Sequence, residues 1–571
     1  MSKKVPPNLL PKIRHLLGRM TRVPRFLYKA CGFTDEELDR PIIAVANSWQ
    51  ESGPGHVHLR DIADAVKAGV RMAGGTPVEF NVIGPCSAFG SDFRYDLPQR
   101  DTIADSIEIQ IKGGLTCEGL VCICTCDKSV PGMWMGAARL NLPTIFITGG
   151  SALPGKVRGE TICFPPDSEV LYENLNKLAR DEITPEEFNE FFIDLEDHWL
   201  VGCGACPMLS TAETTQILSE ALGLALPYSS MALGAEKLRF AKKSGMQIME
   251  LVKEKLKFSK IVKEKSIENA IRVLNALGGG TNGVVHLLAL AYTLKLSAID
   301  LSVFDQLSRE TPYLCNIEPN GPYSTVDFEN AGGVPLLMRE LKNLLHLDVL
   351  TVTGKTLGDN LNDFSFKNIQ LNRDIIASIQ KPFAPSGAIA VLHGNLAPRG
   401  AITRISFKRR SSSESFEGPA KCFNSSEDAL VGVFVGKVNS GDALIVRYQG
   451  PRAAAMSEIL AVVIAINIVG LENIIIISDG RFSGASYGLV YIGHVAPEAY
   501  VGGPLAIVQD DDLVKIDIKK RTLNVDLPQE TIEARLNAWK PPKMRKKKGV
   551  LAIWAQIAEQ ADKGAVLKTF M

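Results

Sequence analysis

Residues 119–128 read Gly-Leu-Val-Cys-Ile-Cys-Thr-Cys-Asp-Lys, an apolar run that ends in a thiol, a carboxylate and an amine. The turn pair Pro131-Gly132 follows at once. A short apolar run closed by turn residues predicts a buried strand that leads into a helix. A thiolate prefers iron or zinc, whereas a carboxylate prefers magnesium or manganese. Cys126-Asp127-Lys128 therefore predicts a strand-to-helix turn that carries metal chemistry.

Strand-like and helical patterns alternate on both sides of this turn. In chain order the runs are 41–46, 58–73, 77–83, 102–112, 119–125, 133–140 and 144–148. Such alternation predicts an α/β fold, a parallel sheet with helices on both faces. Ligands of these sheets gather beyond the carboxyl ends of the strands. We therefore expect four segments at those ends to converge: Asn47-Ser48-Trp49, Gly84-Pro85-Cys86, Cys126-Asp127-Lys128 and Gly149-Gly150.

The rest of the chain changes character near residues 381–386. Helical patterns dominate residues 168–345, and the pattern at 263–277 stops at a triple glycine, as helices often do. Short strand-like runs follow the change at 388–392, 429–435, 443–447 and 474–478, with a hairpin-like pair around 510–527. We predict two domains: an α/β domain over residues 1–380 and a smaller β-rich, barrel-like domain over residues 381–571.

The bulk composition excludes several classes of protein. With 571 residues, the chain has room for two to four domains at about 150 residues each. The 63 basic and 63 acidic residues cancel, which leaves no basic face for nucleic acid. Residues 1–18 lack the apolar core of a secretory signal, and the apolar stretch 459–469 is shorter than the ~20 residues of a membrane span. Eleven clustered cysteines suit a reducing compartment. We expect a soluble cytoplasmic protein that binds neither nucleic acid nor membrane.

The cysteines divide into core residues and candidate ligands. Cys122 and Cys124 lie inside the apolar run and read as small core side chains. Cys126 lies at the predicted end of the strand, next to the charged residues Asp127 and Lys128. Cys203 and Cys206 form a C-x-x-C that could be a redox pair or half of a zinc site. Because the chain has no second such pair, the simplest role is that one of them joins Cys126 on an iron-sulfur cluster.

Two further segments carry polar groups in apolar surroundings. Ser483 lies in Asp479-Gly-Arg-Phe-Ser-Gly484, after the apolar run 474–477. The serine is a candidate for chemistry or a simple helix cap, and its spacing is not that of a nucleophile elbow. Glu458 lies in the apolar segment 456–464, where an unpaired carboxylate is costly. A metal ion would relieve that cost. Asn282, His56 and His58 are weaker candidates for polar lining or caps.

Taken together, these motifs resemble the family of dihydroxy-acid dehydratases and the related sugar-acid dehydratases, such as phosphogluconate dehydratase. The resemblance covers nearly the whole chain. Besides C-D-K-x-x-P-G and D-G-R-F-S-G, the motifs that carry it are Asn47-Ser48-Trp49, Ile103-Ala104-Asp105-Ser106, Thr351-Val-Thr-Gly-Lys-Thr-Leu357, Gly394-Asn-Leu-Ala-Pro398 and Asp562-Lys-Gly-Ala-Val-Leu567. Pro54-Gly55-His56 and Ile83-Gly84 are most similar to the short type that serves branched-chain amino acid biosynthesis, including that of isoleucine and valine.

This resemblance implies a hydro-lyase that removes water from a 2,3-dihydroxy acid to give a 2-keto acid. It also implies a homodimer with its site between an α/β domain and a β-barrel-like domain. Two alternatives remain open. One is a dehydratase for a sugar acid or a specialised-metabolite acid, and the other is a catalytically weakened paralogue without enzymatic activity.

The resemblance also implies roles for individual residues. Ser483, as an alkoxide, is the base that takes the C2 proton. Lys128 matches a lysine that is carbamylated in the family and binds metal. Cys126 and Cys206 match ligands of an iron-sulfur cluster, either 2Fe-2S or 4Fe-4S. Asp127 and Glu458 match ligands of Mg²⁺.

The chain departs from the family pattern at several of these places. Gly55 stands where many relatives have a cysteine, so Cys86 is the natural third cluster ligand. Relatives read C-D-G where this chain has Cys86-Ser87-Ala88, so Ser87 takes the place of a magnesium aspartate, with Asp92 as another candidate for that ligand. An alanine-rich run, 452–456, replaces a glycine-rich one, and Glu213 replaces a typical asparagine. Either the substrate differs from the usual branched acid, or activity is weakened.

Overall fold

The computed structural model describes residues 23–86, 92–164, 168–366, 369–405, 415–484, 486, 490–543 and 548–568. A four-stranded sheet in the order β2-β1-β3-β4 forms the centre of the amino-terminal half. Every neighbouring pair in it is parallel, as the alternating pattern predicts. Its strands are β1 (Ile42–Asn47), β2 (Thr76–Asn81), β3 (Gly119–Cys124) and β4 (Thr144–Thr148), and the short helices α2 (Val23–Ala30) and α3 (Asp35–Leu38) precede them.

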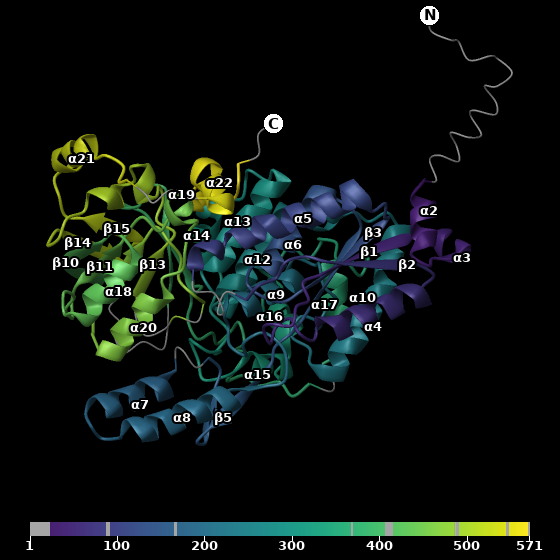
Figure 1. Ribbon diagram of the computed structural model, residues 1–571, viewed down its shortest axis with the longest axis horizontal. Helices are drawn as coiled ribbons and strands as arrows, with labels where there is room; N and C mark the ends of the chain where they lie inside the picture. The colour runs from purple at the N-terminus through teal and green to yellow at the C-terminus, as the bar shows by residue number, and fades with distance from the viewer. Residues whose placement is uncertain are drawn as a thin grey trace, which may run out of the picture.

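Helices cover both faces of this sheet, which confirms the predicted α/β architecture (Figure 1). The pair α4 (Leu59–Met72) and α10 (Gly234–Lys253) lies on one face, and the pair α5 (Pro98–Gly114) and α6 (Ser129–Leu140) on the other. α4 and α10 pack through two glycines. A Cβ at Gly69 would lie 2.0 Å from the Lys242 carbonyl oxygen, and one at Gly245 would lie 2.1 Å from that of Val66. Any side chain at either position would therefore force the two helices apart.

More helices fill the predicted helical region. α12 ends at Gly278, whose φ of 75° is left-handed, so the first glycine of the triple glycine ends the helix as predicted. The next helix begins at Asn282 and so starts just beyond this turn. The helices between the parallel sheet and the carboxyl-terminal half that have not yet been named are α9 (Thr211–Ala221), α11 (Phe258–Ile261), α12 (Glu264–Leu277), α13 (Asn282–Leu294), α14 (Leu301–Glu310), α15 (Thr325–Asn330), α16 (Gly333–Glu340) and α17 (Leu357–Asp363).

An arm projects from the body of the molecule (Figure 1). It consists of α7 (Glu169–Ala179) and α8 (Pro185–His198), which adjoin a small sheet in the order β6-β5-β7. The strands of that sheet are β5 (Leu153–Val157), β6 (Glu160–Ile162) and β7 (Leu200–Val201).

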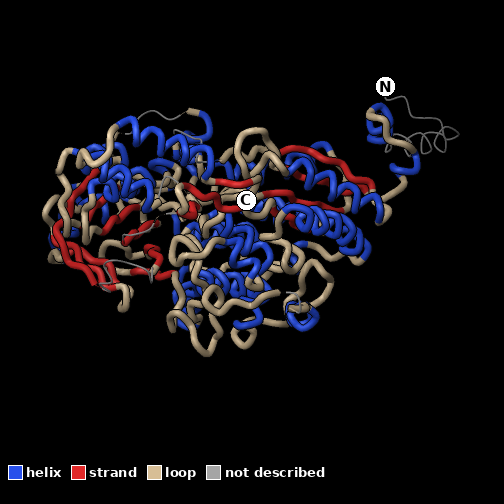
Figure 2. The backbone as a smooth tube through the Cα atoms, turned by 90° about the horizontal axis from the view of Figure 1, so that it is seen from below, coloured by secondary structure: helices blue, strands red, loops and turns tan. Residues whose placement is uncertain are grey.

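The carboxyl-terminal half contains an eight-stranded sheet in the order β15-β14-β10-β11-β12-β13-β9-β8, whose strands curve around one end of the molecule in Figure 2. His393, just after β8, bridges to Thr522 of β15, so the two edge strands meet and the sheet nearly closes into the predicted barrel. Its strands are β8 (Ile389–Leu392), β9 (Ala401–Arg404), β10 (Ser415–Phe423), β11 (Ala443–Val446), β12 (Ile475–Ser478), β13 (Val490–Gly493), β14 (Leu513–Asp517) and β15 (Thr522–Val525).

One predicted strand is wrong. Residues 429–434 belong to the helix α18 (Ser426–Phe434), and Val435 is its C-cap. Ser425 caps this helix by accepting a hydrogen bond from the backbone N–H of Asp428, a start signal that the β-branched run obscured. Ala429 and Val433 are buried while Val431 is 59% exposed. Burial at a spacing of four residues is that of a helix face and not of a strand.

The carboxyl-terminal segment returns to the amino-terminal half. Arg100 of α5 donates to the carbonyl oxygens of Gly564 and Ala565, at 3.0 and 2.8 Å. A Cβ at Gly564 would lie 2.4 Å from the backbone nitrogen of Ala289 in α13. The remaining helices of this half are α19 (Pro451–Ala454), α20 (Leu460–Val469), α21 (Gln529–Ala538) and α22 (Gly549–Ile557). Within the described ranges, no helix combines the length and apolarity needed to cross a membrane.

Candidate active site

The carboxyl ends of the parallel strands come together as predicted. His56 donates through Nδ1–H to the Ser48 carbonyl oxygen (2.7 Å), and His58 Nε2 lies 2.9 Å from that of Gly149. A Cβ at Gly84 would lie 2.9 Å from the Ser48 carbonyl oxygen. Burial lowers the pKa of His56 to about 4, so its ring is neutral at pH 7. Both histidines thus line the site and join loops from different strands.

The turn after β3 holds Cys126, Asp127 and Lys128 in a fixed conformation. Ser129 Oγ donates to the Cys126 carbonyl oxygen (3.0 Å) and accepts from the backbone N–H of Thr125 (3.1 Å). These two bonds tie the end of the strand to the first residue of α6. The sequence therefore places the thiol, the carboxylate and the amine on one rigid strand-to-helix turn.

Three cysteine thiols from separate segments share one environment. A hydrogen bond with Cys86, followed by burial, raises the pKa of Cys126 well above its usual range. Burial, and next the neighbouring Cys86, raise the pKa of Cys206. The thiols of Cys126 and Cys206 are therefore protonated when no metal is bound. Because a metal binds the thiolate, cluster binding would release these protons.

Gly55 lies directly against this group of thiols. A Cβ there would lie 2.9 Å from Cys126 Sγ and 2.8 Å from Thr125 Cγ2. These are closer than side-chain contacts allow, so the position admits no side chain unless Cys126 moves. The chain around residue 55 therefore packs so closely that it leaves no room for the cysteine that many relatives have at this position.

Cys122, Cys124 and Cys203 differ from these three cysteines in their exposure. Cys122 and Cys124 are fully buried within β3, which confirms the prediction that they are core residues. Cys203 is exposed, unlike Cys206, its partner in the C-x-x-C pattern. Of that pair, the structure places Cys206 near Cys86 and Asp127.

Lys128 is a buried cation between two carboxylates. Its Nζ lies 2.9 Å from Asp96 Oδ2 and 3.3 Å from Asp127 Oδ2. The side chains of Lys128 and Asp96 are 1% and 2% exposed. Burial alone would lower the pKa of Lys128, but Asp96 and then Asp127 more than offset this, so the pKa is raised. The unmodified amine is therefore charged at neutral pH.

Arg481 joins this group to Glu458 from the carboxyl-terminal half. Its guanidinium pairs with Asp96 on one side and with Glu458 Oε1, at 2.9 Å, on the other. Asn282 Nδ2 donates to the same Glu458 oxygen at 3.1 Å. Burial raises the pKa of Glu458, although Arg481 and Lys128 oppose that shift. The two halves of the chain thus build one buried ionic network.

The loop that carries Ser483 is fixed at both ends. Asp479 accepts from the backbone N–H groups of Gln449 and Ala499, at 2.8 and 2.9 Å. Burial, followed by the charge of Glu498, raises the pKa of Asp479 to about 7. At the other end, a Cβ at Gly484 would lie 2.7 Å from the backbone nitrogen of Thr211, where α9 begins. The glycine allows the loop to lie directly on that helix.

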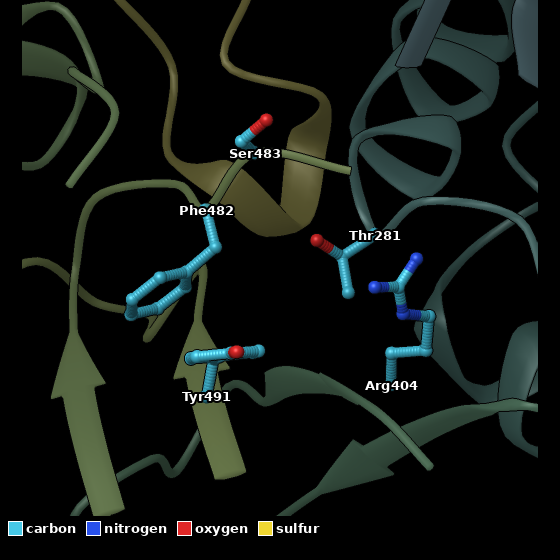
Figure 3. A pocket seen from close by; sticks show the side chains of 5 residues that line it. All are labelled: Thr281, Arg404, Phe482, Ser483 and Tyr491. Carbon is cyan, nitrogen blue, oxygen red and sulfur yellow. The ribbon is translucent and has the colours of Figure 1, made fainter. Parts of the chain in front are cut away.

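A small cavity of about 10 Å³ lies behind this loop, with space for about one water molecule. Arg404 donates across it to the carbonyl oxygens of Gly484 (3.0 Å) and Ser486 (2.7 Å). The Ser483 hydroxyl points away from Arg404 and Thr281 (Figure 3). Arg404 therefore supports the backbone of the loop, while the hydroxyl faces the opposite side. No local sequence pattern marks Arg404, because its role depends on contacts with residues 80 and 82 positions away.

Of the two residues expected to replace the magnesium aspartate, the structure describes only Asp92. Ser87 lies outside the described residues. Asp92 pairs with Arg94 through both carboxylate oxygens, at 2.7 and 2.6 Å, and is 33% exposed. Asp96, the buried carboxylate beside Lys128, was not predicted from the sequence. Its only signal was an acidic residue in a segment that leads into a helix.

As they stand, no three or more His, Cys, Asp or Glu side chains within the described ranges have the spacing to hold a metal ion. The donor types nevertheless fit the two expected groups. Three neighbouring thiols suit an iron-sulfur cluster, and carboxylates suit Mg²⁺. The charged amine of Lys128 lies among those carboxylates, where a metal cation would compete with it.

Comparison with known proteins defines the class to which this fold and site belong. Residues 40–360 match the family described as Dihydroxy-acid/6-phosphogluconate dehydratase N-terminal, and residues 374–565 match its C-terminal counterpart. The chain belongs to this dehydratase family.

Similar proteins with curated names carry the name dihydroxy-acid dehydratase. The chain is 43% identical to the one from Ignicoccus hospitalis and to the one from Methanosarcina barkeri, over 553 residues in each case. It is 42% identical over 554 residues to the one from Pyrococcus furiosus. Each comparison covers 95% of this chain and 97% of the relative.

Proposed function

We propose that this chain is a hydro-lyase that dehydrates a 2,3-dihydroxy carboxylic acid to a 2-keto acid. The observation that carries the proposal is the buried ionic network of Lys128, Asp96, Arg481 and Glu458, which brings the Cys126-Asp127-Lys128 turn and the Ser483 loop into one site. Full-length similarity to dihydroxy-acid dehydratases supports the same reaction.

The reaction has two chemical difficulties, and different groups in the site address each of them. The C2 hydrogen is weakly acidic, and the C3 hydroxyl is a poor leaving group. We assign the removal of the C2 proton to Ser483, as an alkoxide on its anchored loop. The C3 hydroxide leaves and takes up the proton that Ser483 removed, which gives water and restores the alkoxide, and the resulting enol becomes the 2-keto acid. When bound, the iron-sulfur cluster and Mg²⁺ supply Lewis acidity toward the departing hydroxyl and the substrate oxygens.

We assign the cluster to Cys86, Cys126 and Cys206, and Mg²⁺ to Asp127 and Glu458. Three thiols are compatible with a 2Fe-2S or a 4Fe-4S form. Lys128 is carbamylated in this proposal, which converts a repelling ammonium into an anionic oxygen ligand. The pairing of its amine with two carboxylates supports a place for this residue at the metal.

A cavity of about 520 Å³ beside Cys86 bears on the substrate. Its described lining is apolar at Ile83, Pro85, Phe93, Pro98 and Val550 and polar or acidic at Cys86, Asp92, Tyr95, Asp96, Gln99 and Thr102. Because no basic side chain is among these described lining residues, the cavity offers no partner for a phosphate group, and its apolar part suits an alkyl tail. We therefore favour a branched dihydroxy acid, as used in isoleucine and valine biosynthesis.

We extend the proposal to the organisation of the protein. The strands of the parallel sheet all precede residue 149 and those of the barrel all follow residue 388, which supports a division near residue 381. None of the eleven cysteines, all of which lie in the described ranges, forms a disulfide, which suits the reducing cytoplasm. Family membership supports a homodimer.

Anaerobic purification tests the proposal directly. We expect bound iron and sulfide, and keto-acid formation from a branched dihydroxy acid but not from phosphorylated sugar acids. Cys86→Ser should lose iron, whereas the matched control Cys203→Ser, at an exposed thiol, should retain it. Protein without iron and sulfide, or without turnover on any dihydroxy acid, would refute the proposal.

A further inference from the structure

Glu213 is a buried acid in the first turn of α9, and the proposed function gives it no role. Its side chain is fully buried, and it is one of the places where the chain departs from the family pattern. Its Oε2 accepts a hydrogen bond from Gln216 Nε2 at 2.8 Å, about one turn further along the helix. Burial raises the pKa of Glu213 well above its usual range, so this side chain is the uncharged acid at neutral pH. Glu213 therefore acts on its surroundings through hydrogen bonding and not through charge.

The amide of Gln216 links Glu213 to the loop after β4. The backbone N–H of Gly150 donates to Gln216 Oε1 at 2.7 Å. Since a backbone N–H can only donate, the amide oxygen must face Gly150 and the NH₂ group must face Glu213. Glu213 as acceptor thus fixes the orientation of an amide that is itself fully buried. Without that acceptor, a buried donor would lose its partner.

Gly150 in turn holds the segment that carries Cys206. Its carbonyl oxygen accepts from the backbone N–H of Ala205 at 2.9 Å, and the Ala205 carbonyl oxygen accepts from that of Ala152 at 2.9 Å. Ala205 thereby pairs with Ser151 in a parallel bridge, immediately before Cys206. A displacement of Gly150 would therefore move the backbone that carries the thiol.

We propose that Glu213 is a positioning residue for Cys206. Its influence passes from the carboxyl group to the amide of Gln216, and from that amide to the N–H of Gly150. From there it passes through the Gly150 carbonyl to the residue before Cys206. An acceptor at residue 213 holds this chain of contacts in one arrangement, so the thiol keeps one position in the site. The inference deepens the proposed function and rests on it only for the assignment of Cys206 to the cluster.

The test compares two variants at residue 213 in the full-length protein. Glu213→Met keeps the length of the side chain but removes the acceptor, whereas Glu213→Gln keeps an acceptor oxygen and matches the uncharged acid. The matched control is Glu220→Met, because Glu220 is another buried acid of α9 whose hydrogen-bond partners are Tyr228 and Ser230. All values are compared per folded molecule, so that a general loss of stability does not count.

Hydrogen exchange of the Ala205 amide, followed by mass spectrometry, measures the anchoring directly. We expect exchange about tenfold faster in Glu213→Met than in the wild type, because the bond to Gly150 opens more often. Glu213→Gln and Glu220→Met should exchange at the wild-type rate. Wild-type exchange in Glu213→Met, a failure of Glu213→Gln to restore slow exchange, or equal acceleration in both methionine variants would overturn the inference.

Iron retention is a second readout, and it separates the inference from the proposed function. After anaerobic reconstitution, a chelator should remove iron about tenfold faster from Glu213→Met than from the wild type, since groups that orient metal ligands are typically worth about 10-fold to 100-fold in affinity. Equal rates of iron loss would overturn the link to Cys206. Wild-type protein that takes up no iron would reject the proposed function, and the Ala205 exchange would then decide the role of Glu213 alone.

Discussion

The substitution Gly484→Ala tests how far the position of Ser483 depends on the contact between its loop and α9. A new Cβ would lie 2.7 Å from the backbone nitrogen of Thr211 and 2.8 Å from the carbonyl carbon of Ser210. Ordinary contact begins at 3.4 Å, so the loop must retreat by about 0.7 Å, the difference between 3.4 and 2.7 Å, because a packed helix start does not yield. Since a misplacement of about 1 Å costs about a hundredfold in rate, we expect kcat to fall about 10-fold to 100-fold.

The assay is keto-acid formation, with iron content measured on the same sample. Gly113→Ala in α5 is the matched control, because its new Cβ would meet nothing within 4 Å. Both variants should retain full iron content, since the thiols lie on other loops. Full kcat in an iron-replete Gly484→Ala protein would refute the role given to this contact. Loss of iron in that variant would place the damage at the cluster instead.

Three further predictions follow from the packing and charges of the site. In Gly55→Ala the added Cβ would lie 2.9 Å from Cys126 Sγ; we expect reduced iron content, and full iron content would contradict the close packing. Arg481→Met removes the shared partner of two buried carboxylates, so we expect a loss of about 3–5 kcal/mol of stability. In a guanidinium titration its midpoint should lie below that of Lys355→Met, which breaks only an exposed pair; equal midpoints would oppose this. Burial lowers the pKa of His56 from 6.5 to about 4, so the unfolded chain takes up a proton first, and stability is lost as pH falls from about 6.5 toward 4, by about 3 kcal/mol. His56→Asn should lose less stability over that range, and an identical pH profile would argue against a neutral buried ring.

Much of the fold followed from local patterns. Six residues of β3, Gly119–Cys124, form a fully buried strand as the apolar run predicts. The triple glycine ended α12 because a left-handed residue stops a helix wherever it occurs. The strand predicted at residues 429–435 is wrong, because there the side-chain composition and the capping signal point to different structures. Their β-branched composition favours a strand, but the cap at Ser425 and the burial of one face made them a helix.

By itself, the sequence determined that chemistry-bearing residues would gather at one sheet edge. Parallel strands joined by helices always bring their carboxyl ends together, so the places of Cys126, Asp127 and Lys128 followed from periodicity. Only the tertiary structure decided which carboxylates face Lys128. Asp96 and Arg481 are 385 residues apart in the chain, and no local pattern encodes their meeting. The pair forms only when the two halves of the chain pack against each other. This packing buries both charges, and a buried charge is stable only when it is paired with an opposite charge.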